Sequence, residues 1–410
     1  MTDPILKGLP SHVDLKDADH LRLVDEKVDE LLGEFDSRVE LEALESELLQ
    51  EDGPLPIFPL LILKVAKSKL IIQSIKEEVT LSVVLAVYKE HNRIRQAHEH
   101  PHGEDFLRRK VSQLDRLLGD QPNFRWRLIV VDDGCPEGSG KIAQGIVESE
   151  GLQEKAEVRF LAEGIEKGVP AVKALESTDE SQKGGSIIYG MWHATQQEVE
   201  GEHIVVYTDA DLSTHLGQVG LLIEPIVVGG KDAAIGSRRE PDSVVVKKGT
   251  RNDRGKLFIY LWKRMVPVLG DIIDTQCGFK AFRRDTLAEI LDDLLEYKFA
   301  FDIELLLRTA LGAQDRITKV PLAWIDSEEA STTTDIQPYL PMLRAIASMY
   351  RTYLPPEEAR EEFAAFIEGL DDESFDRLVS RIPSAIVDRE PFEFADFDGV
   401  TPEDLRRRIL

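Results

Sequence analysis

Two aspartates, Asp209 and Asp211, stand two positions apart directly after an apolar run at residues 204–208. Carboxylate oxygens are hard ligands, and such a pair suits Mg²⁺ or Mn²⁺ that bridges two phosphates of a bound ligand. The ion would act as a Lewis acid on a phosphate leaving group, which gives Asp211 a part in catalysis. Ser213 could add a ligand directly or through water. A solvated turn is the alternative for an Asp-x-Asp pair, and the preceding apolar run favours the metal site.

A second acidic pair, Asp132 and Asp133, follows another apolar run at residues 128–131. An ionised aspartate only accepts hydrogen bonds, so Asp133 could take the N3–H of uracil or an N–H of guanine. Gly134 would let the chain turn sharply after the run. Tyr88 ends an earlier apolar run and is placed to lie against a base, although an ordinary half-buried position fits it equally well. These residues predict a nucleotide site.

Basic residues follow at further points of the chain. Lys183-Gly184-Gly185 precedes a helix-like stretch at residues 186–194, and glycines at a helix start let backbone N–H groups approach a phosphate. The segment lacks the Gly-Lys-Ser/Thr ending of a P-loop, and an ordinary loop is the alternative. Three arginines could bind the phosphate of an acceptor: Arg238, Arg251 and Arg254.

Asp302 and Glu304 lie within an apolar stretch at residues 299–305. Acids in such surroundings are costly unless they are paired or used. We expect Asp302 to act as a general base or to position an acceptor. A helix cap or a buried ion pair with an arginine is the alternative.

Short apolar runs that alternate with helical stretches must position these residues. Continuous β-branched runs of this length, separated by helices, predict a parallel sheet that helices cover on both faces. Ligands bind such sheets at the carboxyl ends of the strands, where both acidic pairs lie. The predicted strands are Leu81–Tyr88, Leu128–Val131, His203–Thr208, Ala233–Ile235 and Val320–Trp324.

Helical extensions flank this α/β domain, which we place at residues 80–350. Residues 1–79 contain two predicted helices between residues 18 and 50, whose leucines could form a homodimer contact or pack onto the main domain. Residues 351–410 end in a short helix that a cap at Thr401 should begin.

The composition is that of a folded protein, with 42% hydrophobic and 31% charged residues among 410. A net charge of -26 repels phosphate backbones and argues against nucleic acid as a partner. Two cysteines, Cys135 and Cys277, indicate no disulfide framework, so the cytoplasm is the expected location. Leu55–Ile72 is apolar but too short and too charged to span a bilayer, although it could touch a membrane surface.

Taken in order, these segments resemble the inverting family 2 glycosyltransferases, which have the GT-A fold. The resemblance covers roughly residues 80–345 and begins with an opening strand that runs to Glu90. Within the family it is closest to dolichyl-phosphate glucosyltransferases and related polyprenyl-phosphate sugar synthases. Four segments carry this likeness: Lys183-Gly184-Gly185, Asp209-Ala210-Asp211-Leu212-Ser213, Ile235-Gly236-Ser237-Arg238 and Asp274-Thr275-Gln276-Cys277-Gly278-Phe279-Lys280.

The resemblance implies transfer of a hexose from UDP-glucose or GDP-mannose, with Asp209 and Asp211 as metal ligands. It places Arg238 and Arg254 opposite an acceptor phosphate, with Arg251 as the rival of Arg254. The donor site that it implies consists of Tyr88, Glu90, Asp133, Lys183, Gly184 and Asp209. The sequence departs from the family pattern at Ala86, Lys89 and Cys135, and none of these changes removes a proposed ligand.

Family likeness and chain features favour different acceptors. The family implies a polyprenyl phosphate, whereas the absence of an apparent membrane helix and the acidic charge favour a soluble anionic acceptor.

Two other classes of function remain open at this point. A sugar-phosphate nucleotidyltransferase would share the sheet and its acids, but it would usually have a glycine-rich loop where Tyr88-Lys89-Glu90-His91 stands. A non-catalytic sugar-nucleotide scaffold is the other alternative.

Overall fold

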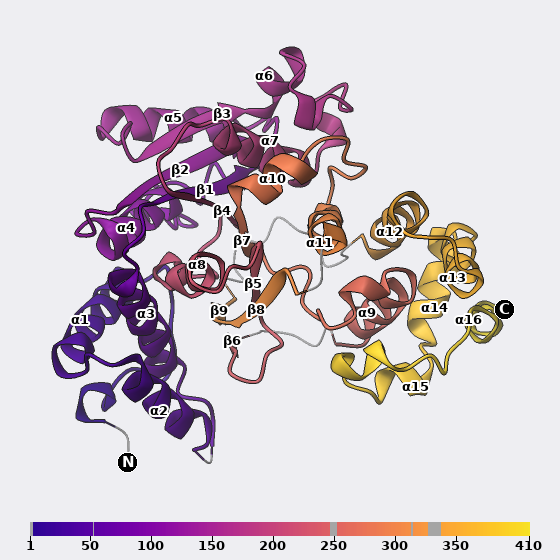
Figure 1. Cartoon of the computed structure of the whole chain (residues 1–410), viewed down its shortest axis with the longest axis horizontal. Helices are drawn as coiled ribbons and strands as arrows, with labels where there is room; N and C mark the ends of the chain where they lie inside the picture. The colour runs from indigo at the N-terminus through magenta and orange to yellow at the C-terminus, as the bar shows by residue number, and fades with distance from the viewer. Residues whose placement is uncertain (1–2, 52, 247–251, 313–314, 327–337) are drawn as a thin grey trace.

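The computed structural model describes residues 3–51, 53–246, 252–312, 315–326 and 338–410. At its centre is a seven-stranded sheet with the order β3-β2-β1-β4-β7-β5-β8 (Figure 1). All neighbours run parallel except at β7, which is antiparallel to β4 and to β5. The mostly parallel sheet predicted from the apolar runs is confirmed. Its strands are β1 (Val79–Val87), β2 (Phe124–Asp132), β3 (Ala156–Phe160), β4 (Glu202–Thr208), β5 (Ala233–Ser237), β7 (Phe279–Arg283) and β8 (Ile317–Pro321).

Helices cover both faces because successive side chains of a strand point to opposite sides of the sheet. Val84 of β1 contributes to one hydrophobic core, with α7 and α11. Val83 and Leu85 contribute to the other core, with α4. The helices of this region are α4 (Phe106–Leu118), α5 (Ser139–Ser149), α6 (Leu161–Glu166), α7 (Gly184–Thr195), α8 (Gly220–Val227), α9 (Asn252–Met265), α10 (Arg284–Ile290) and α11 (Phe301–Gly312), with the short 3-10 turn η4 (Leu216–Gln218).

Three strands were not predicted. The strand β7 has Lys280 as its second residue and Arg283 as its last, and β3 carries Glu157 and Arg159, so neither forms a continuous apolar run. The third, β6 (Val244–Val246), pairs in parallel with β9 (Ala323–Ile325) in a small second sheet. Because β9 and β8 are separate strands, the single run predicted at Val320–Trp324 divides between two sheets.

The N-terminal extension consists of α1 (Ala18–Glu34), α2 (Arg38–Leu49) and α3 (Ile57–Ser74), which lie together at one side of the sheet (Figure 1). The two helices predicted between residues 18 and 50 are confirmed. Val24, Val28 and Leu31 of α1 are buried in the hydrophobic core that also contains β1. These side chains therefore pack within the protomer and are not available for a dimer contact. The predicted homodimer is not tested by this structure.

The structure argues against the alternative in which Leu55–Ile72 touches a membrane surface. Most of this segment forms α3, whose side chains are buried from Phe58 to Ser68. Lys64 and Lys67 both pair with the buried Glu45 of α2. A helix that packs on nearly all sides has no apolar stripe of its own, which explains why the segment shows no amphipathic period. In the described parts of the chain, no helix combines the length and apolarity needed to cross a membrane.

The C-terminal extension lies at the opposite side of the molecule and packs on α9 (Figure 1). Lys256 Nζ of α9 donates to the Val387 carbonyl at 2.8 Å, and Tyr260 OH donates to the Val400 carbonyl at 2.6 Å. The cap predicted at Thr401 is confirmed by reciprocal hydrogen bonds with Asp404. The helices are α12 (Tyr339–Tyr353), which crosses the predicted domain border, α13 (Glu358–Glu368), α14 (Asp372–Ser380), α15 (Ser384–Val387) and α16 (Pro402–Ile409).

Candidate active site

The Asp209–Asp211 segment lies at the carboxyl end of β4. The Asp209 N–H donates to the Gly278 carbonyl at 3.1 Å, which joins the segment to the start of β7. A Cβ at position 278 would overlap the Asp209 carboxylate, so the glycine provides room for that side chain. The Asp211 carboxylate accepts the Ser213 N–H at 3.0 Å. Both carboxylates are half-buried and lie on one short loop, as predicted.

Cations surround this carboxylate pair. Lys183 Nζ forms an ion pair with Asp209. Burial opposes ionisation of Asp209, but the charges of Lys183, Arg238 and Lys110 outweigh it and lower the pKa of Asp209 below its usual range. Asp209 is therefore ionised near neutral pH, and its carboxylate forms an ion pair with the Lys183 ammonium.

The residues at this loop fit a divalent cation. Asp209 and Asp211 supply two hard carboxylates, and Ser213 lies two residues beyond them, which is the donor set that Mg²⁺ and Mn²⁺ prefer. The described residues contain no group of three or more His, Cys, Asp or Glu side chains poised for a metal. The protein would thus supply two carboxylates at most, and phosphate and water oxygens would complete the coordination. Lys183 pairs with Asp209 Oδ1, so a metal would use the other carboxylate oxygen or compete with this ion pair.

Asp133 anchors the loop that leads into α7. Its Oδ1 accepts the hydroxyls of Ser181 and Ser186, each at 2.6 Å, and its Oδ2 accepts the Lys183 N–H at 2.9 Å. Burial raises the pKa of Asp133, and these three hydrogen bonds oppose the rise. Because each carboxylate oxygen accepts about two hydrogen bonds, one acceptor position remains at Oδ2. Reading of a base by Asp133 stays a prediction, and it could involve only that position.

Tyr88 and the Asp132 loop lie at the neighbouring ends of β1 and β2. The Asp132 carboxylate accepts the N–H groups of Cys135 at 2.9 Å and Gly140 at 2.7 Å, so it folds the loop between them. Gly134 has φ 73°, which confirms the predicted sharp turn. Tyr88 is 45% exposed and is therefore open to a stacking partner.

Glu90 is held by protein side chains. Its carboxylate accepts two hydrogen bonds from Arg93, at 3.0 and 3.1 Å, and Arg93 also pairs with the buried Glu104. Burial, with smaller repulsion from Asp211 and Glu104, raises the pKa of Glu90 to about 7 despite the Arg93 charge. Glu90 thus belongs to a buried network beside Asp211, and direct contact with a donor stays a prediction.

Lys183 and Gly184 begin α7, as predicted. Lys183 has φ 72°, and a Cβ on Gly184 would lie 2.6 Å from the carbonyl oxygens of Tyr297 and Lys298. The Gly185 N–H donates to the Tyr297 carbonyl at 2.9 Å. These glycines therefore allow close approach of the segment before α11. This packing alone accounts for the two glycines, and the predicted contact of the segment with a phosphate stays a prediction.

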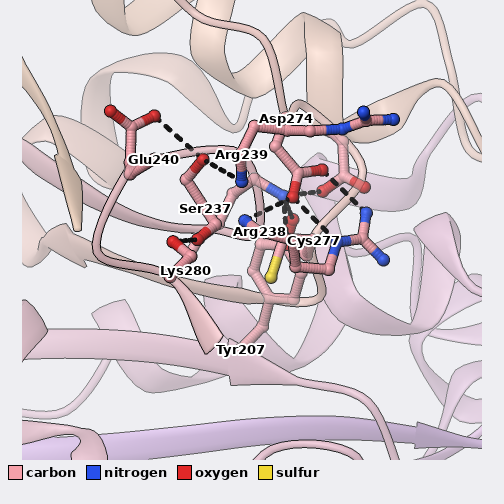
Figure 2. Close-up of polar contacts among 10 residues, drawn as sticks. Tyr207, Ser237, Arg238, Arg239, Glu240, Asp274, Cys277 and Lys280 are labelled. Atoms are coloured by element: carbon pink, nitrogen blue, oxygen red, sulfur yellow. Dashed lines mark hydrogen bonds and ion pairs between the residues drawn. The ribbon is translucent and has the colours of Figure 1, made fainter. Parts of the chain in front are cut away.

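Asp302 is paired with a lysine that was not predicted, and not with an arginine. Lys280 Nζ donates to Asp302 Oδ1 at 3.1 Å, to Tyr207 OH at 2.8 Å and to the Cys277 carbonyl at 2.5 Å. Tyr207 and Lys280 are cross-strand partners in β4 and β7, and both are labelled in Figure 2. Burial raises the pKa of Asp302, which the Lys183 charge opposes, and burial lowers the pKa of Lys280. Glu304 serves the fold, because it accepts the N–H groups of Leu295 and Glu296 and the hydroxyl of Tyr353.

Arg238 is committed to Asp274, as Figure 2 shows. Its Nε and Nη2 donate to the two Asp274 oxygens at 2.8 and 2.7 Å, and its backbone N–H adds a third hydrogen bond at 2.8 Å. Arg254 in α9 points toward the C-terminal extension, with Nη2 3.9 Å from Asp376 of α14. Arg251 lies outside the described residues. The two described arginines are thus in different surroundings, and contact of either with an acceptor phosphate is a prediction.

Comparisons with known proteins agree with this geometry. The family model described as Glycosyl transferase family 2 matches residues 82–291, half of the chain. Glycosyltransferase AglD of Haloferax volcanii is 28% identical over 60% of this chain, a match that spans only 33% of AglD. The dolichyl-phosphate beta-glucosyltransferase of Drosophila melanogaster is 26% identical over 67% of this chain and 75% of its own length. The undecaprenyl-phosphate mannosyltransferase of Micrococcus luteus is 30% identical over 49% of this chain and 72% of its own length.

The matched region contains the carboxylate pair after β4, the Asp133 loop and the Arg238–Asp274 pair. The fold that carries them is the mostly parallel α/β sheet that the GT-A resemblance implied. The chain therefore belongs to glycosyl transferase family 2, and it is a glycosyltransferase.

Proposed function

We propose that this glycosyltransferase moves a hexose from UDP-glucose or GDP-mannose, with inversion and with the help of Mg²⁺ or Mn²⁺, to an anionic acceptor. The observation that carries the proposal is the meeting of Asp209, Asp211 and Lys183 at the carboxyl end of β4. Two carboxylates that could bind a metal and one lysine thus lie at the carboxyl ends of the strands, where parallel sheets bind small molecules.

On the donor side, a bound cation would supply Lewis-acid stabilisation of the departing nucleoside diphosphate, held by Asp209, Asp211 and Ser213. Lys183 would neutralise phosphate oxygens with its ammonium once it leaves Asp209. Tyr88 would stack on the base, and the free acceptor position of Asp133 would take one base N–H. The hydrogen bonds of Asp133 to Ser181 and Ser186 support this role, because they hold its carboxylate in one orientation.

On the acceptor side, the state of Asp302 favours a substrate that is already ionised. An acceptor phosphate or carboxylate needs no strong base, whereas a hydroxyl would need a base to take its proton. Asp302 is buried, and its Oδ1 already accepts a hydrogen bond from Lys280. We therefore assign Asp302 to positioning of the acceptor and not to strong base catalysis.

The names of the relatives include dolichyl phosphate and undecaprenyl phosphate. A polyprenyl phosphate and a soluble phosphorylated or carboxylated acceptor share the anionic group that an arginine would bind. We favour the soluble acceptor, since the apolar Leu55–Ile72 segment that could have met a membrane is buried inside the fold.

Incubation with labelled UDP-glucose or GDP-mannose, in Mn²⁺ or in EDTA, tests the donor side. Slow release of the nucleoside diphosphate in Mn²⁺ alone is the expected result, and Asp211→Asn should abolish it. Asp271→Asn is the matched control, because this aspartate is 73% exposed and lies 3.7 Å from Lys319 on the surface. Equal release in EDTA would contradict the metal role, and formation of a nucleoside triphosphate from pyrophosphate would contradict the transfer.

Sedimentation with liposomes that contain polyprenyl phosphate tests the acceptor side. The protein should stay in the supernatant, and a screen of soluble phosphorylated and carboxylated compounds should yield a labelled product. Donor- and lipid-dependent co-sedimentation would instead support the lipid acceptor.

A further inference from the structure

Lys110 is a buried cation without a hydrogen-bond partner. It lies in α4, its side chain is fully buried, and its Nζ has no acceptor among the described residues. Lys64, Lys263 and Lys280 are about equally buried, but each has a carboxylate or carbonyl oxygen at its Nζ. A buried ammonium without a direct partner is costly, so its presence here needs a physical reason.

The inward face of α4 places Lys110 beside the loop that carries Asp211. Gln113, about one turn further along α4, accepts the Leu216 N–H at 2.9 Å. Leu216 begins η4, which follows Asp211 in the chain. The carboxylates of Asp211 and Asp209 are the opposite charges that act most strongly on the Lys110 ammonium. Lys110 is therefore a buried cation on a helix that packs against the turn after Asp211, and the two carboxylates are the main opposite charges that act on it.

The two lysines that act on Asp209 differ in kind. Lys183 pairs directly with Asp209 and its side chain is 29% exposed, so it has space to leave when a ligand enters. Lys110 has no exposed surface, and α4 fixes its backbone. Burial lowers the pKa of Lys110 to about 8, so near pH 7 it is mostly protonated, and unlike Lys183 it has no exposed surface from which to leave the core.

We propose that Lys110 is a built-in counter-ion of the Asp209–Asp211 pair, a positioning residue that stabilises the two carboxylates without a metal and weakens their hold on a free divalent cation. This inference rests on the metal role of the two aspartates under the proposed function. The diphosphate of a donor brings the negative charge that offsets Lys110. Metal and nucleotide should therefore bind to this site together, and the metal alone should bind weakly.

Binding of Mn²⁺, followed by the electron paramagnetic resonance signal of the free ion, tests the proposal in the wild type and in Lys110→Met. Without nucleotide, the variant should bind Mn²⁺ about tenfold more tightly, because one repelling charge is gone. The increase in Mn²⁺ affinity on adding UDP or GDP should be smaller in the variant. Lys263→Met is the control for replacing a buried lysine on another helix, because its Nζ donates to the Gly270 carbonyl and the acid that acts on it is Asp271. The Mn²⁺ affinity of this control should equal that of the wild type. An unchanged or weaker affinity in Lys110→Met would overturn the inference.

The same titrations separate this inference from the metal role itself. A wild type that binds no Mn²⁺, even with nucleotide, would remove the metal from the proposed function. Binding that appears only in Lys110→Met would still support the counter-ion. Absence of binding in both proteins would overturn it.

A second measurement leaves Lys110 in place, in case the methionine variant does not fold. Asp211→Asn keeps an oxygen that can accept the Ser213 N–H, and its thermal midpoint is measured in EDTA. If no counter-ion compensated the two aspartates, removing one charge would relieve their repulsion and raise the thermal midpoint of Asp211→Asn. A counter-ion predicts a lower midpoint, because Lys110 loses the carboxylate that acts on it most strongly. An unchanged or higher midpoint would refute the role of Lys110.

Discussion

Replacement of Asp274 by asparagine tests how far the Arg238–Asp274 pair supports the site. Three Arg238 N–H groups, at 2.7 to 2.8 Å, converge on the Asp274 carboxylate. The side chains of Asp274 and Arg238 are 5% and 19% exposed, so water cannot replace the lost charge readily. Asp274→Asn keeps the shape of the side chain and leaves the guanidinium without its counter-charge.

The expected loss of unfolding free energy is about 3 kcal/mol at pH 7. Breaking a buried pair by removing one partner costs about 3–5 kcal/mol, and the asparagine oxygen can still accept part of the hydrogen bonding, which favours the lower end. Burial alone would raise the pKa of Asp274, but Arg238 holds it well below its usual range. A depressed folded-state pKa contributes stability above the unfolded value of about 4, and that stability is lost as the pH falls below it.

Urea unfolding of the wild type and Asp274→Asn at pH 7 and pH 3 measures both effects. The difference between the proteins should shrink at pH 3, where the wild type begins to lose the contribution of its carboxylate. The exposed control Asp271→Asn should lose no more than about 0.5 kcal/mol at pH 7. A loss below about 1 kcal/mol at pH 7, or a difference that is the same at both pH values, would refute this reasoning.

Three further outcomes are expected. Asp211→Asn and the double variant with Asp209→Asn should lose similar turnover, because loss of either carboxylate empties a shared metal site, and additive losses in a turnover assay would count against one ion. Asp133→Asn should weaken UDP or GDP binding by about 1.5–3 kcal/mol in a calorimetric titration, and unchanged affinity would remove Asp133 from the base site. Burial, with a smaller effect of Arg284, lowers the pKa of His203 to about 4. The fold should therefore lose about 3 kcal/mol as the pH falls from 6.5 to 4, and His203→Gln, which can keep the Ser82 contact, should flatten that loss in pH-dependent urea unfolding.

The parts of the fold that follow from local pattern could be predicted. The strands β1, β2, β4 and β5 each contain a short apolar run, and the buried positions of these runs divide between two cores. The cap at Thr401 depends on residues within three positions of one another. The placement of Asp209 and Asp211 at a strand end followed from the run before them, so the candidate metal site needed no knowledge of the rest of the chain.

The partners of the site residues could not be predicted, because each depends on contacts between distant segments. Arg238 and Asp274 are 36 positions apart and meet because β5 and β7 are neighbours. The strand β7 was itself missed, since Lys280, its second residue, interrupts the apolar run. Lys110 and Asp211 are further apart still, and the helical pattern of α4 gives no sign of the carboxylates that it faces. For Leu55–Ile72, the lack of an amphipathic period argued against membrane contact, but the partners that bury α3 could not be named from the sequence.

The charges at the site explain how so acidic a chain could bind an anionic donor. The net charge is -26, but charges further than about 10 Å away are largely screened at ordinary salt concentrations. Near the carboxylates, Lys183 faces Asp209, Lys110 acts on Asp211 and Lys280 pairs with Asp302. Asp209, Asp211 and Asp302 are thus each acted on by a lysine before any ligand arrives, and distant exposed acids have little influence on them. Loss of a single buried cation should consequently change nucleotide affinity more than neutralisation of several exposed acids.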